Sequence, residues 1–225
     1  GGNDIRGGDG PLNVADMYER HEMVDAFVRA GVECGYEANP DYNGEKQDGF
    51  GYYQVTQNDG RRHSAAKAYL EPARTPANLT IETNSYARRI ILEETRAVGV
   101  AYECRGEQRE ARAAGSVIVS AGAVQSPQLL ELSGIGAPDI LREHGIEVRH
   151  ALAGVGENYR DHYAARIAWR VKQPITLNDQ TRGFFLVKEA IKYALTRRGI
   201  FTWTAGIGHA FIKSRPELDT PDCQC

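Results

Sequence analysis

The sequence predicts a mixed α/β fold in which helices and strands follow one another irregularly, as an α+β mixture rather than as regular βαβ repeats. Two observations carry this prediction. Apolar residues recur every three or four positions within residues 20–34 and 184–195, which is typical of amphipathic helices. Short runs of β-branched and aromatic residues, separated by turn residues, are concentrated between residues 79 and 119 and are typical of strands.

The first third of the chain is expected to contain two helices and a strand. Spaced apolar residues predict the helix over residues 20–34, and residues 49–57 are strand-like up to the turn at residues 58–60. A short helix is expected over residues 63–69, with its end near Pro72.

The middle of the chain is expected to be rich in strands. Charged and glycine-containing turns separate the short apolar runs, which favours antiparallel hairpins. The run Ser116-Val-Ile-Val119 is expected to be a buried strand because its core is entirely β-branched. The other predicted strands are residues 79–81, 86–93, 97–103 and 107–111.

The stretch SAGAVQSPQLLELSGIG, residues 120–136, places small residues on both sides of a predicted helix. Ser126 is expected to be the N-cap, Pro127 the first helical residue, and Gly134 the residue just past the end. Small side chains before the helix would let another molecule approach the backbone closely. The sequence then predicts a short helix over residues 138–144 and a strand over residues 146–149.

The last third is expected to begin a different sheet. Residues 165–172 alternate between apolar and polar side chains, as in a half-exposed strand, and residues 184–195 have the spacing of a helix. Because the chain starts with Gly1 and ends in strand-like residues, we expect it to be an internal piece of a longer protein.

Composition excludes several function classes. The net charge of −3 does not favour nucleic acid as a partner, and no apolar run is long enough for a transmembrane segment. The four cysteines have neither zinc-site nor redox-motif spacing, so we expect no metal site, no disulfide framework and a cytoplasmic location.

Individual motifs in the sequence identify no reaction. Three Gly-x-Gly pairs lack the third glycine of a dinucleotide loop and are expected to be turns. Asp161-His162 could form an acid–base or metal pair, although a polar turn that bonds to its own backbone is favoured. Arg88-Arg89 could meet a phosphate, although a solvated strand edge is favoured.

One longer string is specific. GAVQSPQLLELSGIG, residues 122–136, resembles position by position the second signature of the glucose-methanol-choline (GMC) oxidoreductases. Further segments resemble that family in the same order, and the nearest similarity is to its choline dehydrogenase-like alcohol dehydrogenases. These segments begin at Arg6, Asn39, Gly49, Gly60, Asn78, Arg96 and Gly154, and the resemblance covers essentially the whole chain.

The resemblance implies an FAD-dependent enzyme in which hydride passes from the CH–OH group of a small-molecule alcohol to the flavin. It implies part of an FAD/NAD(P)-binding three-layer domain over residues 76–163. Residues 1–75 would be a substrate-side connecting segment, and residues 164–225 would start an antiparallel-sheet substrate domain. The cofactor-binding residues that it implies are Ala87, through its backbone toward the adenine, together with Ser120, Ala121, Gly122, Ala123 and Ser126.

Two motifs of the family have no counterpart in this chain, namely the dinucleotide loop and the catalytic histidine. No catalytic residue is therefore assigned, and neither His162 nor His209 lies in the matching motif. The alternatives to an oxidoreductase are a hydroxynitrile lyase-like protein of the same fold and a non-catalytic remnant. Unpaired sheet edges would favour poor solubility or a homodimer for the isolated chain. The alcohol and the electron acceptor stay open.

Overall fold

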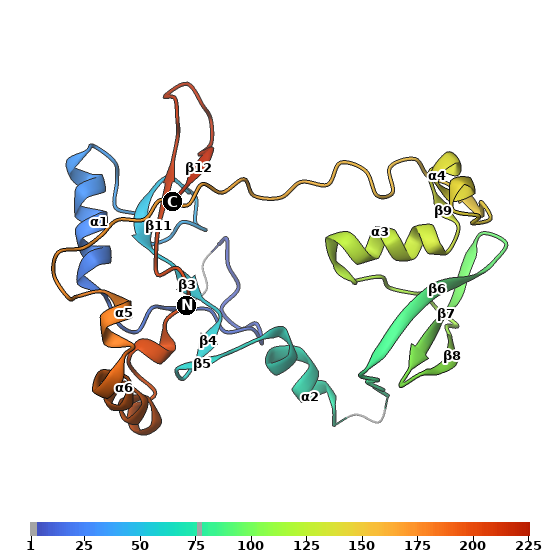
Figure 1. Ribbon diagram of the computed structural model, residues 1–225, viewed down its shortest axis with the longest axis horizontal. Coiled ribbons are helices and arrows are strands. Elements are labelled where there is room, and N and C mark those ends of the chain that lie inside the picture. The colour runs from blue at the N-terminus through green and yellow to red at the C-terminus, as the bar shows by residue number, and fades with distance from the viewer. Residues whose placement is uncertain (1–3, 76–77) are drawn as a thin grey trace. The chain divides into compact units, whose positions relative to one another are not determined.

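A computed structural model of the chain describes residues 4–75 and 78–225. The chain divides into two compact units (Figure 1). Unit 1 is formed by Gly1–Leu79 together with Ala168–Cys225, and unit 2 is Thr80–Ile167. Both contain helices and strands, so the predicted mixed α/β class is confirmed.

Unit 1 is built around a three-stranded antiparallel sheet in the order β12-β11-β2. In this sheet His209 lies opposite Gly51 and Ala210 opposite Phe50. The elements of the unit are β1 (Ala15–Asp16), α1 (Glu22–Glu33), β2 (Gly49–Tyr52), β3 (Gln54–Val55), β4 (Gln57–Asn58), β5 (Arg61–Arg62), the π-helix η1 (Ala66–Leu70), α2 (Glu71–Ala73), α5 (Leu177–Gln180), α6 (Gly183–Thr196), the 3-10 helix η2 (Ile200–Thr202), β11 (Gly208–Ile212) and β12 (Cys223–Gln224).

Helix α1 packs on β2 through its predicted apolar face. The Phe27 ring lies 5.0 Å from the Phe50 ring, centroid to centroid. Gly31 is buried there, and the position requires glycine because a Cβ would come within 2.5 Å of the Phe50 ring. His21 caps the helix by accepting a hydrogen bond from the Met23 N–H at Nδ1. Periodicity therefore identified this helix to within two residues.

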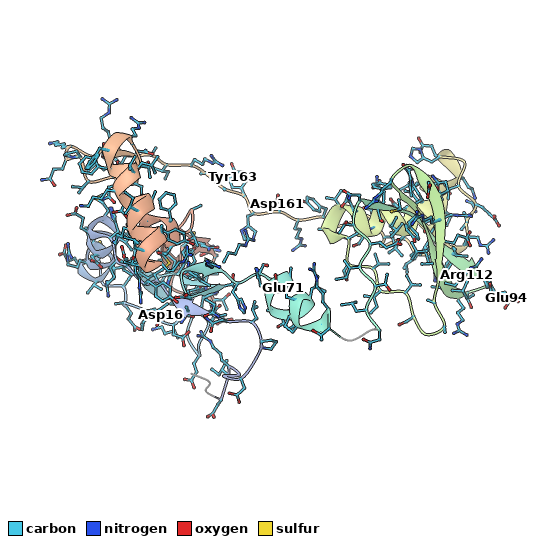
Figure 2. The ribbon with its side chains drawn as sticks, turned by 90° about the horizontal axis from the view of Figure 1, so that it is seen from below. Asp16, Glu71, Glu94, Arg112, Asp161 and Tyr163 are labelled. Atoms are coloured by element: carbon cyan, nitrogen blue, oxygen red, sulfur yellow. The ribbon has the colours of Figure 1, made fainter. Side chains whose placement is uncertain are left out.

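Unit 2 contains an antiparallel meander in the order β6-β7-β8, with α3 in contact with β6 (Figure 1). Its tight turns place Glu94 and Arg105 at positive φ, and Figure 2 shows Glu94 at the tip of the first hairpin. The elements of the unit are β6 (Ser85–Glu93), β7 (Arg96–Cys104), β8 (Glu107–Arg112), α3 (Gly122–Leu132), β9 (Ile135–Gly136), α4 (Pro138–Glu143) and β10 (His150–Ala151).

The three hairpin strands, the helix α6 and the short helix α4 were predicted correctly. The expected strand over residues 49–57 is instead divided into β2, β3 and β4. The short helix of residues 63–69 starts later, and Pro72 lies inside α2, in the first turn where proline is tolerated.

Four expected strands are absent from the described residues. Residues 79–81, 116–119 and 165–172 are irregular, and the expected strand at 146–149 is replaced by β10, which starts at His150. Ile118 has 85% of its surface exposed, so its β-branched run is not buried. The first three of these segments have strand composition, but no described strand pairs with them to complete a ladder of hydrogen bonds.

Candidate functional site

The start of α3 and the two residues before it form an exposed turn of small side chains, which we call the small-residue turn and define as Ser120, Ala121, Gly122 and Ala123. All four are exposed. Gly122 has a φ of +94° and no atom within 4 Å of the position that a Cβ would take. The backbone conformation therefore requires glycine, and the space beside Gly122 is open to another molecule.

Ser126 is not the N-cap that the sequence predicted. Helix α3 begins at Gly122, so Ser126 lies inside its first turns, and the N-cap residue Ala121 receives no side-chain cap. The Ser126 Oγ instead accepts a hydrogen bond from the Ala121 N–H at 3.0 Å. The Ser-Pro pair misled the prediction, because Pro127 is tolerated at the sixth helical position.

Polar backbone groups near the small-residue turn lack helical partners. The first N–H groups of any α-helix have no carbonyl to bind within the helix, and no side chain caps α3 at Ala121. Pro127 has no N–H, so the Ala123 carbonyl loses the helical donor that position 127 would supply. The turn therefore presents backbone donors and an acceptor beside small, exposed side chains.

The opposite end of α3 is packed tightly. The Ser133 Oγ donates to the Leu129 carbonyl at 2.5 Å and accepts from the Ile90 N–H of β6 at 2.7 Å. Gly134 has a φ of +84°, and a Cβ there would come within 2.4 Å of the Glu147 carbonyl oxygen. These small residues are therefore required by packing within unit 2.

Ala87 lies on β6 and pairs with Tyr102 of β7. Strand β6 is an edge strand, and a register shift between Ala87 and Arg89 marks a bulge immediately after Ala87. Such edges carry backbone N–H and C=O groups that are free to bind a partner. Ala87 is exposed, and unit 2 brings its strand against α3, whose first residues form the small-residue turn.

Sequence reasoning missed the bridge made by Ser133. The detectable signal was a serine four residues after Leu129 at a helix end, because serine hydroxyls commonly bond to the carbonyl of residue i−4. Ser133 is 8% exposed and its partner Ile90 is 6% exposed, so the bridge is shielded from water.

Unit 1 holds a second feature that the sequence did not reveal. His209 is fully buried against the rings of Tyr42, Tyr53 and Phe211, and burial lowers its pKa. Neither ring nitrogen meets hydrogen-bond geometry, although backbone groups of β2 lie close enough to oppose part of that shift. A cavity of about 620 Å³ lies nearby, lined by Tyr53 among other residues.

The two residue pairs that the sequence left open make the contacts of the favoured, non-catalytic alternatives. Asp161 accepts a hydrogen bond from the backbone N–H of His162 at 2.7 Å, as expected of a polar turn, and both residues are exposed. Figure 2 shows Asp161 and Tyr163 on an extended stretch of chain. Arg88 pairs with Glu103 across the hairpin, as a solvated strand edge would. Among the described residues, no three His, Cys, Asp or Glu side chains are grouped to hold a metal ion.

Comparison with known proteins identifies the family. A family model described as GMC oxidoreductase matches residues 5–164. The chain belongs to the GMC oxidoreductase family. The family predicted from the signature is thereby confirmed.

Among the described residues, no helix has the length and hydropathy that a membrane span requires.

Curated relatives extend the similarity over the whole chain. The chain is 41% identical over 226 aligned residues to oxygen-dependent choline dehydrogenase 1 of Chromohalobacter salexigens, covering 100% of this chain and 40% of that protein. It is 39% identical to an oxygen-dependent choline dehydrogenase of Vibrio vulnificus, with the same coverage. The chain thus spans about 40% of the length of the curated relatives it matches.

Solved structures of GMC-like fold match as well. Pyridoxine 4-oxidase from Mesorbium loti is 33% identical with a TM-score of 0.63, over 66% of this chain and 30% of that chain. An FAD-dependent oxidoreductase from Chaetomium thermophilum has a TM-score of 0.80 at 21% identity, over 92% of this chain and 37% of that chain. The second similarity concerns the fold alone.

Proposed function

We propose that this chain is part of an FAD-dependent oxidoreductase that acts on CH–OH groups of small-molecule alcohols. Family membership supports the reaction class, and relatives named choline dehydrogenase support a choline-like alcohol. The observation that carries the cofactor assignment is the small-residue turn, where exposed backbone groups and the open space beside Gly122 are not used by the chain's own packing.

The described residues fit such a cofactor. Ser120, Ala121, Gly122 and Ala123 would lie against it, with Ser126 holding the Ala121 N–H in place. The backbone of Ala87 on the edge of β6 would bind the adenine. FAD supplies the two-electron acceptor for a hydride leaving the alcohol carbon. The chain's own contribution is binding and orientation of that group, and we assign no proton-accepting side chain.

The domain assignment follows from the same reasoning. We propose that residues 76–163 are part of the FAD-binding domain, with residues 1–75 and 164–225 on the substrate side. The boundary at residue 76 lies outside the described residues. The antiparallel sheet β12-β11-β2 of unit 1 supports a substrate-side sheet.

We also propose a cytoplasmic setting and a homodimer. All four cysteines are free, which supports a reducing compartment. Exposed apolar side chains on one helix, including Phe184 and Leu195 of α6 at 79% each, support self-association. Size-exclusion chromatography of the chain that gave only a compact monomer would contradict the dimer.

The decisive experiment is a titration of the purified chain with FAD, followed by visible absorption and flavin fluorescence. We expect a perturbed flavin spectrum that saturates, because the small-residue turn and the β6 edge lie in one compact unit. Free-flavin behaviour at every concentration would contradict cofactor binding by this chain. In the whole protein, alcohols are expected to bleach the bound flavin anaerobically; cyanohydrin cleavage without bleaching would contradict the oxidoreductase.

A further inference from the structure

The hydroxyl of Ser133 forms a buried bridge between two elements of unit 2. It accepts the Ile90 N–H at 2.7 Å and donates to the Leu129 carbonyl at 2.5 Å. Ser133 closes α3, whereas Ile90 belongs to the edge strand β6. One side-chain oxygen therefore satisfies a backbone donor of the strand and a backbone acceptor of the helix.

The bridge meets β6 where the strand is least regular. The register shifts between Ala87 and Arg89, so Arg88 has no partner opposite it in β7. A bulge weakens local pairing and allows the strand to bend. Ile90 is the second paired residue after the bulge, and its N–H is held from the outer side by Ser133. This bond limits how far the edge at Ala87 can move.

We propose that Ser133 is a positioning residue, which fixes the edge of β6 at Ala87 relative to α3 and thereby supports binding of an adenine nucleotide. The inference rests on the proposed function, which places the adenine at Ala87 and the rest of the cofactor at the small-residue turn. Both ends of the bridge are buried, so water does not replace the hydroxyl when it is removed.

The side chain at position 133 determines whether the Ile90 N–H keeps a hydrogen-bond partner. Alanine at position 133 would leave the buried Ile90 N–H without a partner, which disfavours the present strand position. Threonine keeps the same oxygen and adds only a methyl group. Leu141→Val is the matched control: Leu141 is 1% exposed in the same unit, and its truncation loosens packing without touching the bridge.

The test compares the 225-residue chain with its Ser133→Ala, Ser133→Thr and Leu141→Val variants. Binding of ADP is measured by calorimetry, because ADP carries the adenine and lacks the flavin. We expect Ser133→Ala to bind ADP roughly tenfold more weakly, from the loss of a buried hydrogen bond. Ser133→Thr is expected to restore most of the affinity, and Leu141→Val to leave it unchanged.

A second readout requires no ligand. Backbone amide exchange in the ligand-free chain should accelerate in Ser133→Ala at Ile90 and also at residues 87–89. Equal weakening of ADP binding by Ser133→Ala and Leu141→Val, or exchange confined to Ile90, would overturn the positioning role alone. Failure of the unmodified chain to bind either ADP or FAD would overturn the proposed function and this inference together.

Discussion

The two ends of α3 use small residues for different reasons. At the C-terminal end, Ser133 and Gly134 are small because a strand edge and the Glu147 carbonyl oxygen approach them. At the N-terminal end, Gly122 needs its positive φ but meets no atom, and its neighbours are exposed. Small residues in one continuous motif thus serve internal packing at one end and leave open space at the other.

A substitution at the packed end of α3 should change stability most. Gly134→Ala should lower the free energy of unfolding of unit 2 by about 3 kcal/mol, since the new Cβ combines a left-handed backbone with a contact to the Glu147 oxygen. Urea unfolding followed by circular dichroism measures the change. A loss of unfolding free energy below about 1 kcal/mol would show that the packed end relaxes easily. That result would contradict the difference in packing between the two ends of α3.

The buried His209 should make the free energy of unfolding of unit 1 depend on pH. Its pKa is lowered in the folded state from about 6.5, so the unfolded chain binds the proton first as the pH falls. Stability of unit 1 should therefore be greatest above pH 6.5 and decrease below it, by up to about 1.4 kcal/mol per pH unit. Urea unfolding at pH 7.5 and 5.5 measures this effect.

The control for that measurement is His209→Leu, which places an apolar side chain at the buried position and removes the titrating group. This variant should lose most of the difference between the two pH values in unit 1. Persistence of the full difference in His209→Leu would show that other groups cause it.

Gly122→Ala tests the open end and should have a smaller effect on stability. The strain of a left-handed alanine is expected to cost about 1 kcal/mol, because no atom lies within 4 Å of the new Cβ. FAD binding should weaken by more than this stability loss explains, as followed by flavin fluorescence. Unchanged FAD affinity in this variant would remove the reason for assigning the open end to a ligand.

Ser126→Ala should have the smallest effect. It removes the bond from the Ala121 N–H to the Ser126 Oγ, which is exposed and worth about 0.5 kcal/mol. We expect a slight stability loss with a detectable loss of FAD affinity, because Ala121 belongs to the small-residue turn. The control is Ser116→Ala at an exposed position of the same unit; if both variants behave alike, Ser126 has no role in shaping the turn.

Features that depend on nearby residues could be predicted from the sequence alone. Periodic apolar residues located α1 and α6, and turn residues between short runs located the hairpins β6-β7 and β7-β8. The signature at residues 122–136 was sufficient to identify the family, because motif recognition needs only the order of residues.

Features that depend on distant partners could be read only from the three-dimensional structure. The runs at 116–119 and 165–172 have strand composition but pair with no other strand in the part of the chain that the structure describes, and a strand exists only where another strand pairs with it. Ser133 bonds to Ile90 across 43 positions, and His209 is buried by Tyr42 from far earlier in the chain. Local patterns record backbone preference, whereas pairing and burial are properties of residues that the fold brings together.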